Sequence, residues 1–221
     1  MTDLVLLVPS RGRPKNVTRL LEACAATCRA ATVVHFGFDN DDPEMLANLA
    51  AADGALFSVS QRMGLARWTN YLAAAHVSDG AVCSIGDDMV PLTDGWDERL
   101  LAACGTTGMA YPNDRRRDDI PECVVMTTDI VAALGWMCPP GLEHWYIDNA
   151  WSDLGRGAGC IAYLPDVVVE HRHPNVPGGD KPDRTYWDAS PKMAADMAAY
   201  QRWRLKGMRE DIGKVRVLCQ R

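Results

Sequence analysis

The sequence predicts an α/β domain built on a Rossmann-like, mostly parallel central sheet with flanking helices. Between residues 4 and 85, short apolar segments alternate with segments of helical periodicity. The first apolar segment, Leu4 to Val8, has no polar position, which is typical of a strand that is buried on both faces. The chain has 221 residues, which is enough to bury one large core but too few for two large domains.

The first half of the chain predicts four strands separated by helices. The first strand covers residues 4–8, and a helix over 15–29 follows it, with apolar residues at intervals of three and four. The next elements are a strand over 31–38, a helix over 44–52, a strand over 55–59, a helix over 65–76 and a strand over 81–85. Repeated strand–helix–strand units of this length place their strands parallel in one sheet.

The second half of the chain is less regular. We expect strands near 108–111, 123–127, 160–163 and 167–169, and helices near 128–134 and 147–155. Residues 172–190 are rich in proline, glycine and charge, and they predict a loop. Helical periodicity returns over 191–206, where Met193, Met197, Tyr200 and Trp203 are spaced to share one apolar face.

Composition argues against several classes of protein. No segment approaches the roughly 18 consecutive apolar residues of a membrane helix. The N-terminus has no basic region before its short apolar run, so we expect neither a cleaved secretory signal nor a membrane partner. The eight cysteines include no CxxC pair, which argues against a zinc ribbon or a thioredoxin-type site. A reducing cytoplasm is therefore the expected location.

Charge is distributed unevenly along the chain. Residues 1–180 carry 13 basic and 24 acidic side chains, whereas residues 181–221 carry 10 basic and 5 acidic side chains. The overall net charge of −6 argues against a protein that coats nucleic acid. Basic residues and Trp203 in the tail suit contact with DNA or another anionic acceptor. A tail that docks on the acidic body is an equal alternative.

Charged residues follow the predicted strands at their carboxyl ends, where open α/β sheets bind ligands. They are Ser10, Arg11 and Arg13 after the first strand, Asp39 after the second, and Asp87 with Asp88 after the fourth. Neither a GxGxxG fingerprint nor a GxxxxGK[ST] phosphate loop is present, which argues against dehydrogenases and P-loop enzymes. Adjacent carboxylates can hold Mg²⁺ or Mn²⁺ on a diphosphate. Alternatively, they bond local backbone in a turn.

Several short motifs resemble those of metal-dependent glycosyltransferases with the GT-A fold, family 2 in particular. The run over 90–96 is similar to the stretch that follows the family's DxD-type motif. Residues 8–14 resemble the first strand and nucleotide loop, and residues 38–42 resemble the end of the second strand. Gly64 and Asn70 match part of the GxxxAxN helix motif.

The resemblance continues into the half of the chain that binds the acceptor in this family. Residues 134–136 resemble its glycine-aromatic turn, and residues 145–149 resemble the segment where an acidic pair precedes a helix. Residues 162–171 resemble a strand that begins with Pro-Asp and ends in a histidine. The motifs occur in the family's order and together cover about residues 4–173.

The sequence departs from the family pattern at three places. Gly86 stands where many relatives have an acidic residue or asparagine, so the metal site depends mainly on Asp88. Trp68 stands where the helix motif usually has alanine. Ile147 replaces one residue of the acidic pair, so the assignment of a base rests on Asp148 alone.

The resemblance implies one GT-A-like catalytic domain over residues 1–175. Its nucleotide-sugar half would cover residues 1–91 and its acceptor half residues 92–175. Residues 176–221 would form a loop and a basic, helical C-terminal extension.

By resemblance, the chain is expected to be an inverting glycosyltransferase that moves a sugar from a nucleoside diphosphate sugar, with a UDP-sugar as the expected donor. The acceptor would carry a hydroxyl, and a hydroxymethylated pyrimidine in DNA, a surface glycan and a protein are the candidates. The resemblance assigns Pro9, Ser10, Arg11, Arg13, Asp39, Gly64 and Asp87 to the donor, Asp88 with Asp87 and His171 to Mn²⁺ or Mg²⁺, and Asp148 to the catalytic base. Short enzymes of this kind also occur in bacteriophages. The expected location is therefore the cytoplasm of a bacterium or of a phage-infected host cell.

The residues themselves support some of these roles and leave alternatives open. Asp148 lies between aromatic residues, which can desolvate a carboxylate and make it a better base. It could instead cap a helix, and Asp153 is the second candidate for the base. His171 and His173 lie on an extended segment, and we expect at most one of them, His171, to face the acidic pair. Alternatively, these histidines pack against neighbouring residues or lie on the surface.

Two other functional classes remain as alternatives. A sugar-phosphate nucleotidyltransferase also uses an α/β sheet and a metal held by carboxylates, but it would need a glycine-rich, lysine-containing first loop. A non-catalytic module that binds a nucleotide sugar or a glycan is the other. Hydrolysis of the donor in the presence of Mn²⁺ distinguishes a transferase from such a module.

Overall fold

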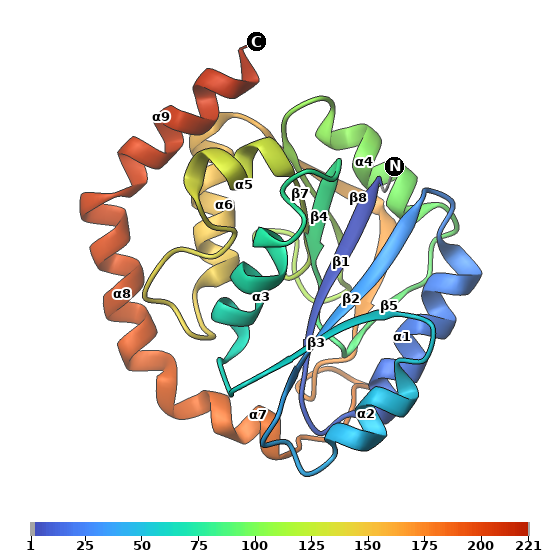
Figure 1. The fold of residues 1–221 in the computed structure, drawn as a ribbon. Helices are drawn as coiled ribbons and strands as arrows, with labels where there is room; N and C mark the ends of the chain where they lie inside the picture. Colours follow the sequence, from blue (N-terminus) through green and yellow to red (C-terminus); the bar gives the residue numbers. More distant parts are fainter. Residues whose placement is uncertain (1–2, 221) are drawn as a thin grey trace.

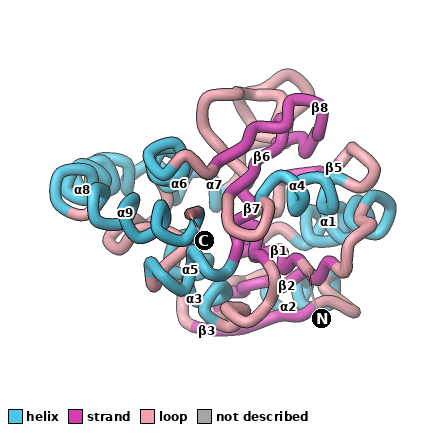
Figure 2. The backbone as a smooth tube through the Cα atoms, turned by 90° about the horizontal axis from the view of Figure 1, so that it is seen from above, coloured by secondary structure: helices cyan, strands magenta, loops and turns pink. Residues whose placement is uncertain are grey.

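The computed structural model describes residues 3–220, which form one sheet with helices on both faces (Figures 1 and 2). The order of the eight strands is β3-β2-β1-β4-β7-β6-β8-β5. The strands are β1 (Leu4–Ser10), β2 (Thr32–Asp39), β3 (Leu56–Ser60), β4 (Ala81–Ser84), β5 (Met89–Pro91), β6 (Met109–Asn113), β7 (Val124–Thr127) and β8 (Ile161–His171). The predicted α/β class with a mostly parallel sheet is confirmed.

The first four strands are parallel to one another, with β1 between β2 and β4. Beyond β4 the sheet becomes mixed: β7 is antiparallel to β4 and β6, and β8 is parallel to β6 but antiparallel to β5. The carboxyl ends of β1, β2 and β4 therefore lie at one edge of the sheet. The strand β8 ends at the same edge, because β8 is parallel to β6, and β4 and β6 are both antiparallel to β7.

Helices cover the two faces unequally. They are α1 (Pro14–Thr27), α2 (Met45–Ala51), α3 (Leu65–Ala74), α4 (Trp96–Cys104), α5 (Thr128–Leu134), α6 (Ile147–Ala158), α7 (Arg184–Ala189), α8 (Met193–Lys206) and α9 (Met208–Cys219). Figure 2 shows α1, α2 and α4 on one side of the sheet, and α3, α5, α6, α8 and α9 on the other. Each side has its own apolar core.

The unbroken apolar run of β1 fills both cores. Val5 and Leu7 point into the core with α3, α5 and α6, whereas Leu4, Leu6 and Val8 point into the core with α1 and α4. Successive side chains of a strand point to opposite faces, so a strand covered on both sides has no polar position. This burial explains why the first strand could be predicted from sequence.

Most predicted elements are present, and the differences lie after β4. The two strands expected near 160–163 and 167–169 form the single strand β8. Its pairing with β6 is irregular between Pro112 and Asn113, whose partners are Leu164 and Val168. Pro165 lies in this irregular stretch, where a missing backbone N–H does not interrupt the ladder.

Three elements of the described residues were not predicted. The strand β5 and the helix α4 have no counterpart in the prediction, and α7 interrupts the expected loop over 172–190. Helix α9 lies in the segment that was expected to form a helical extension. The three residues of β5 are too few to show a periodicity. Before α4, Gly95 takes a left-handed conformation with φ of 66°, which starts the helix without a sequence signal for a polar cap.

The C-terminal helices pack against the rest of the domain. Helix α9 contacts α5 and α6, and at Gly157 a Cβ atom would lie 2.3 Å from Ile212 Cδ1, so any larger residue there would displace the Ile212 side chain. The apolar face predicted for α8 is wrong in part, because Met193 and Met197 are 41% and 40% exposed. The buried side chains are Asp196, Ala199 and Trp203. In the part of the chain that the structure describes, no helix combines the length and apolarity needed to span a bilayer.

Candidate active site

A cavity of about 300 Å³ opens at the carboxyl ends of β1, β2 and β4. Every residue that the resemblance assigns to the site lines it: Pro9, Ser10, Arg11, Arg13, Asp39, Gly64, Asp87, Asp88, Asp148 and His171. The strand-end rule explains the first group of these residues, because parallel strands end at one edge. Asp148 and His171 reach the same cavity from α6 and from the end of β8.

The loop after β1 is fixed by a buried carboxylate. Ser10 Oγ donates to Asp87 Oδ2 at 2.6 Å, and Arg13 Nη1 donates to Asp87 Oδ1 at 2.9 Å. Burial raises the pKa of Asp87, and the positive charge of Arg13 opposes that rise. Because both Asp87 oxygens already accept hydrogen bonds, Asp88 has the more accessible carboxylate of the pair.

Asp88 lies beside His171 because β5 pairs with β8. The antiparallel register places Met89 opposite His171, and His171 Nε2 lies 3.5 Å from Asp88 Oδ1. Burial alone would raise the pKa of Asp88, but His171 and Arg13 hold it below its usual range.

Glu122, a residue that the sequence analysis did not single out, orients the imidazole of His171. Its Oε2 lies 2.6 Å from His171 Nδ1, and its carboxylate also pairs with Arg116. Burial lowers the pKa of His171, but the contacts with Asp88 and Glu122 outweigh burial and raise it to about 10. Glu122 precedes β7 on a loop, and no spacing in the sequence relates it to His171.

Asp88 and His171 are suitable ligands for a hard divalent cation once His171 has lost the proton on Nε2, because only a deprotonated ring nitrogen binds a metal. A carboxylate oxygen and an imidazole nitrogen 3.5 Å apart can bind one ion from adjacent positions. Within residues 3–220, no cluster of three or more His, Cys, Asp or Glu side chains has the geometry of a metal site. The chain thus offers two ligands, and Mg²⁺ sites commonly complete their coordination with phosphate oxygens and water.

Asp39 is held by two donors at the end of β2. Trp68 Nε1 donates to its Oδ1 at 2.7 Å, and Arg11 Nη1 donates to its Oδ2 at 3.1 Å. The indole lies against Gly37, where a Cβ atom would be 2.6 Å from Trp68 Cε3. Trp68, which departs from the family pattern, therefore fixes Asp39 and requires glycine at position 37.

Asp148 lies in the first turn of α6, after Tyr146 at the N-cap. Its Oδ1 accepts a hydrogen bond from the N–H of Asn149 at 2.9 Å. Burial raises the pKa of Asp148 to about 6, opposed by the bond from Asn149, and Glu122 adds to the rise. A carboxyl group with this pKa is suited to accept a proton near neutral pH. The alternative that Asp148 is the N-cap is wrong.

Asp153, the second candidate for the base, is bonded to two side chains of α8 instead of facing the cavity. Tyr200 Oη donates to Asp153 Oδ2 at 2.6 Å, and Arg204 Nε lies 3.1 Å from the same oxygen. Asp153 is also absent from the lining of the cavity. Its carboxylate therefore joins α6 to α8.

Residues 180–189, which follow β8 and are called the acidic segment here, line one side of the cavity. Asp180, Asp183 and Asp188 form ion pairs with Arg19, Arg13 and Arg62, at 2.6, 2.6 and 2.8 Å. Thr185 Oγ1 also donates to the carbonyl oxygen of Arg11 at 2.9 Å. The sequence predicted only a charged loop here, because the basic partners lie more than a hundred residues away in the chain.

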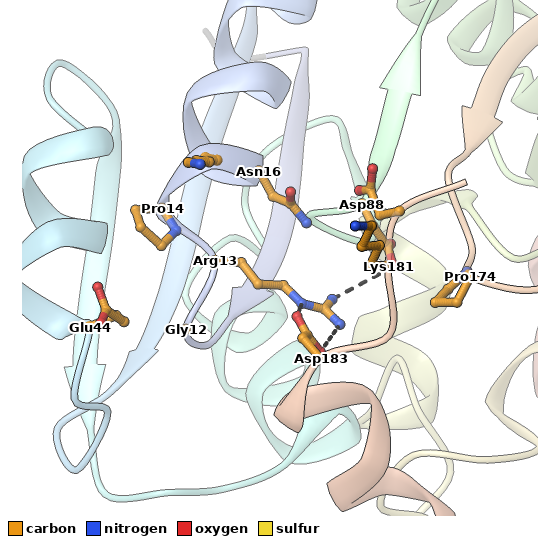
Figure 3. Close-up of a pocket in the computed structure, with 11 residues that line it drawn as sticks. Gly12, Arg13, Pro14, Asn16, Glu44, Asp88, Pro174, Lys181 and Asp183 are labelled. Atoms are coloured by element: carbon orange, nitrogen blue, oxygen red, sulfur yellow. Dashed lines mark hydrogen bonds and ion pairs between the residues drawn. The ribbon is translucent and has the colours of Figure 1, made fainter. Parts of the chain in front are cut away.

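A second cavity of about 350 Å³ lies beside the first and shares Arg13 and Asp88 with it. Figure 3 shows the Arg13 guanidinium between Asp88 and Asp183, with Lys181 nearby. Its nitrogens lie 3.6 Å from Asp88 Oδ2 and 2.6 Å from Asp183 Oδ2. Arg13 therefore joins the acidic segment to the carboxylate pair where the two cavities meet.

No protein-family model and no curated protein sequence matches the chain. Solved structures do match it in fold. S. aureus TarS 1-349 in complex with UDP is 14% identical, with a TM-score of 0.59, over 76% of this chain and 59% of that chain. This chain therefore spans less than two thirds of that TarS structure.

Two further solved structures match more of their own length. Mannosyltransferase PcManGT from Pyrobaculum calidifontis, in complex with GDP-Man and Mn²⁺, is 14% identical with a TM-score of 0.61, over 92% of this chain and 75% of that chain. Glucosyl-3-phosphoglycerate synthase from Mycobacterium tuberculosis, with Mn²⁺, UDP and phosphoglyceric acid, is 10% identical with a TM-score of 0.61, over 90% and 77%. The chain has the GT-A fold, as predicted.

Proposed function

We propose that the chain is a metal-dependent, inverting glycosyltransferase that moves a sugar from a nucleoside diphosphate sugar to an acceptor hydroxyl. One observation carries the proposal: a single cavity contains both the Asp88–His171 pair and the partly buried carboxylate of Asp148. The first can hold a cation on a diphosphate and the second can take a proton. The similar folds support it, since TarS binds UDP and PcManGT binds GDP-Man with Mn²⁺.

In this proposal, the loop after β1 and the end of β2 bind the nucleotide. Backbone and side chains of Pro9, Ser10, Arg11, Arg13, Asp39 and Gly64 contact the donor, and Asp87 holds that loop through Ser10 and Arg13. Asp88 and His171 would hold Mn²⁺ or Mg²⁺, with Asp87 adding negative charge. The bound cation would neutralise the charge that develops on the departing diphosphate.

Asp148 removes the proton from the acceptor hydroxyl. As the acceptor oxygen forms its bond to the anomeric carbon, the bond from that carbon to the diphosphate oxygen breaks. The proton moves to the Asp148 carboxylate, and attack from the face opposite the leaving group inverts the configuration. With a pKa of about 6, Asp148 is mostly deprotonated at pH 7 and still basic enough to accept the proton.

A panel of nucleotide sugars tests the proposal. Binding is measured by thermal shift with and without Mn²⁺, and donor hydrolysis by release of the nucleoside diphosphate. We expect one UDP- or GDP-sugar to raise the melting temperature only when the cation is present, and to be hydrolysed slowly. Binding without hydrolysis or transfer would indicate a non-catalytic module. Release of pyrophosphate from a nucleoside triphosphate and a sugar phosphate would indicate a nucleotidyltransferase.

For the acceptor, we propose hydroxymethylated DNA as the first substrate to test, with a glycan or protein hydroxyl as the alternatives. The basic side chains of Arg202, Lys206 and Arg209 are exposed on α8 and α9. If they bind duplex, replacing all three with glutamine raises the acceptor KM without changing donor hydrolysis. The affinity for duplex also falls steeply with salt, because bound counterions are released. A flat salt dependence would favour a neutral acceptor.

A further inference from the structure

The segment before α6 holds a strained backbone in the cavity wall. His144, Trp145 and Tyr146 line the cavity immediately before Ile147 and Asp148. Tyr146 has a φ of 67°, the left-handed conformation that bulky side chains rarely adopt. Such a conformation persists only where its surroundings hold it in place.

A buried carboxylate from the C-terminal extension binds this segment. Asp196 Oδ1 accepts the N–H of Glu143 at 2.8 Å, and Asp196 Oδ2 accepts the N–H groups of His144 and Trp145 at 2.9 and 2.8 Å. The Asp196 side chain is 1% exposed. Three successive backbone donors therefore converge on one charged group from α8, about 50 residues away in the sequence.

The same end of the extension contacts the segment on its other side. Tyr200, one helical turn after Asp196 on α8, stacks on the ring of Tyr146, with centroids 5.3 Å apart and planes inclined by 17°. Trp145 Nε1 donates to the carbonyl oxygen of Ala189 at 2.8 Å. The extension therefore contacts Trp145 and Tyr146 through both backbone and side chains, directly before the helix that carries Asp148.

The position of Asp196 suits a residue that holds the backbone before α6 in place better than one that only fills the core. An isolated buried carboxylate is unfavourable, so its burial depends on the three N–H donors that it accepts. At this position the face of α8 would otherwise be apolar, as at Ala199 and Trp203. Asp196 is absent from the lining of the cavity, so it acts on the site through residues 143–146, whose backbone it holds.

We propose that Asp196 is a positioning residue for sugar transfer: it holds the left-handed turn at Tyr146, and with it the orientation of the Asp148 carboxylate in the cavity. This inference rests on the proposed role of Asp148 as the base. It makes the C-terminal extension a functional part of the transferase rather than an appendage.

The variant Asp196→Asn tests the inference. Its amide keeps one acceptor oxygen but turns an NH₂ group toward a backbone N–H, so the three-donor arrangement is lost. At saturating donor and acceptor we expect kcat to fall about tenfold or more, while donor affinity stays within about twofold of wild type. We also expect the pKa of Asp148 to change, because its desolvating neighbours move. The charged groups that face Asp148, Glu122 and Arg117, are unchanged in the variant.

Asp211→Asn is the matched control. Asp211 lies in α9 of the same extension, is 8% exposed, and accepts a hydrogen bond from Trp203 Nε1 at 2.9 Å. Its loss should lower the melting temperature without altering kcat or the titration of Asp148. If Asp196→Asn does not fold, Asp196→Glu keeps the charge but moves the oxygens by one methylene, and the inference requires a lower kcat there too.

The readouts separate this inference from the proposed function. The pKa of Asp148, followed by its carboxyl ¹³C shift, needs no donor or acceptor and so reports the positioning even if no sugar is transferred. Wild-type transfer together with an unchanged kcat and an unchanged Asp148 titration in Asp196→Asn would overturn the inference alone. An equal loss of kcat in Asp211→Asn would also overturn it, because the effect would then reflect stability.

Discussion

The two parts of the cavity that we propose for the nucleotide and for the acceptor, called the nucleotide half and the acceptor half here, hold their side chains by different means. In the first half, Ser10 and Asp39 end the strands β1 and β2, and Asp87 follows the neighbouring strand β4, so the register of the sheet brings them together. In the second half, Asp148 follows a left-handed residue, and a helix from the end of the chain fixes that backbone. The comparison teaches that the first group depends on the sheet, whereas the second depends on the extension.

This difference has consequences for substitution. Donors and acceptors in the nucleotide half bond one another directly, as Arg13 and Ser10 do with Asp87, so one substitution affects a small group. In the acceptor half, Asp148 depends on contacts made by other residues to the backbone before it. We therefore expect changes in the first half to affect donor and metal binding, and changes in the second half to affect turnover.

The largest expected effect follows from removal of the cation ligand in the nucleotide half. Asp88→Ala should lower transfer by on the order of a thousandfold, because the charge on the diphosphate is no longer neutralised. Chelation of the wild-type protein with excess EDTA should have the same effect, measured as release of nucleoside diphosphate. Asp166→Ala, at an exposed acid on the same strand as His171, is the control. Full activity in EDTA would contradict metal dependence.

The next largest effect should come from Asp148→Asn in the acceptor half. Loss of a positioned proton acceptor should lower kcat by about a hundredfold or more, while the affinity for the donor, measured by calorimetry, stays near wild type. This result would sharpen the contrast between the halves. If donor affinity falls and kcat does not, Asp148 belongs to the nucleotide half instead.

The sequence predicted, for a physical reason, that the charged residues of the first half lie together at one edge of the sheet. A strand buried on both faces has an unmistakable apolar pattern, and the charged residues after it must lie at the sheet edge. Glu122, Asp183 and Asp196 were missed because each contributes through a partner far away in the chain. The methionine pattern of α8 was also misleading, since a buried Asp196 is stabilised by backbone donors that no sequence pattern reveals.

The pH dependence of turnover should report Asp148 directly. The base must be deprotonated to act, and burial raises its pKa to about 6. At saturating substrates, kcat should therefore rise about tenfold per pH unit below pH 6 and level off above pH 7. The residual activity of Asp148→Asn should lack this rise. A wild-type profile that is flat between pH 5 and pH 7 would exclude a base with this pKa.

The smallest expected effect tests whether the acidic segment belongs with the nucleotide half. Asp183→Asn removes the pair with Arg13, but Arg13 keeps its bond to Asp87, so the guanidinium stays near its position. Partly exposed ion pairs contribute at most about 1 kcal/mol, so the donor KM should rise by about two- to fivefold with kcat unchanged. Asp188→Asn, which loses its pair with Arg62, is the matched control for the segment's attachment. A change in kcat without a change in donor KM would place the segment with the acceptor half. The segment would then affect catalysis through the bond from Trp145 to Ala189 more than it affects donor binding through Arg13.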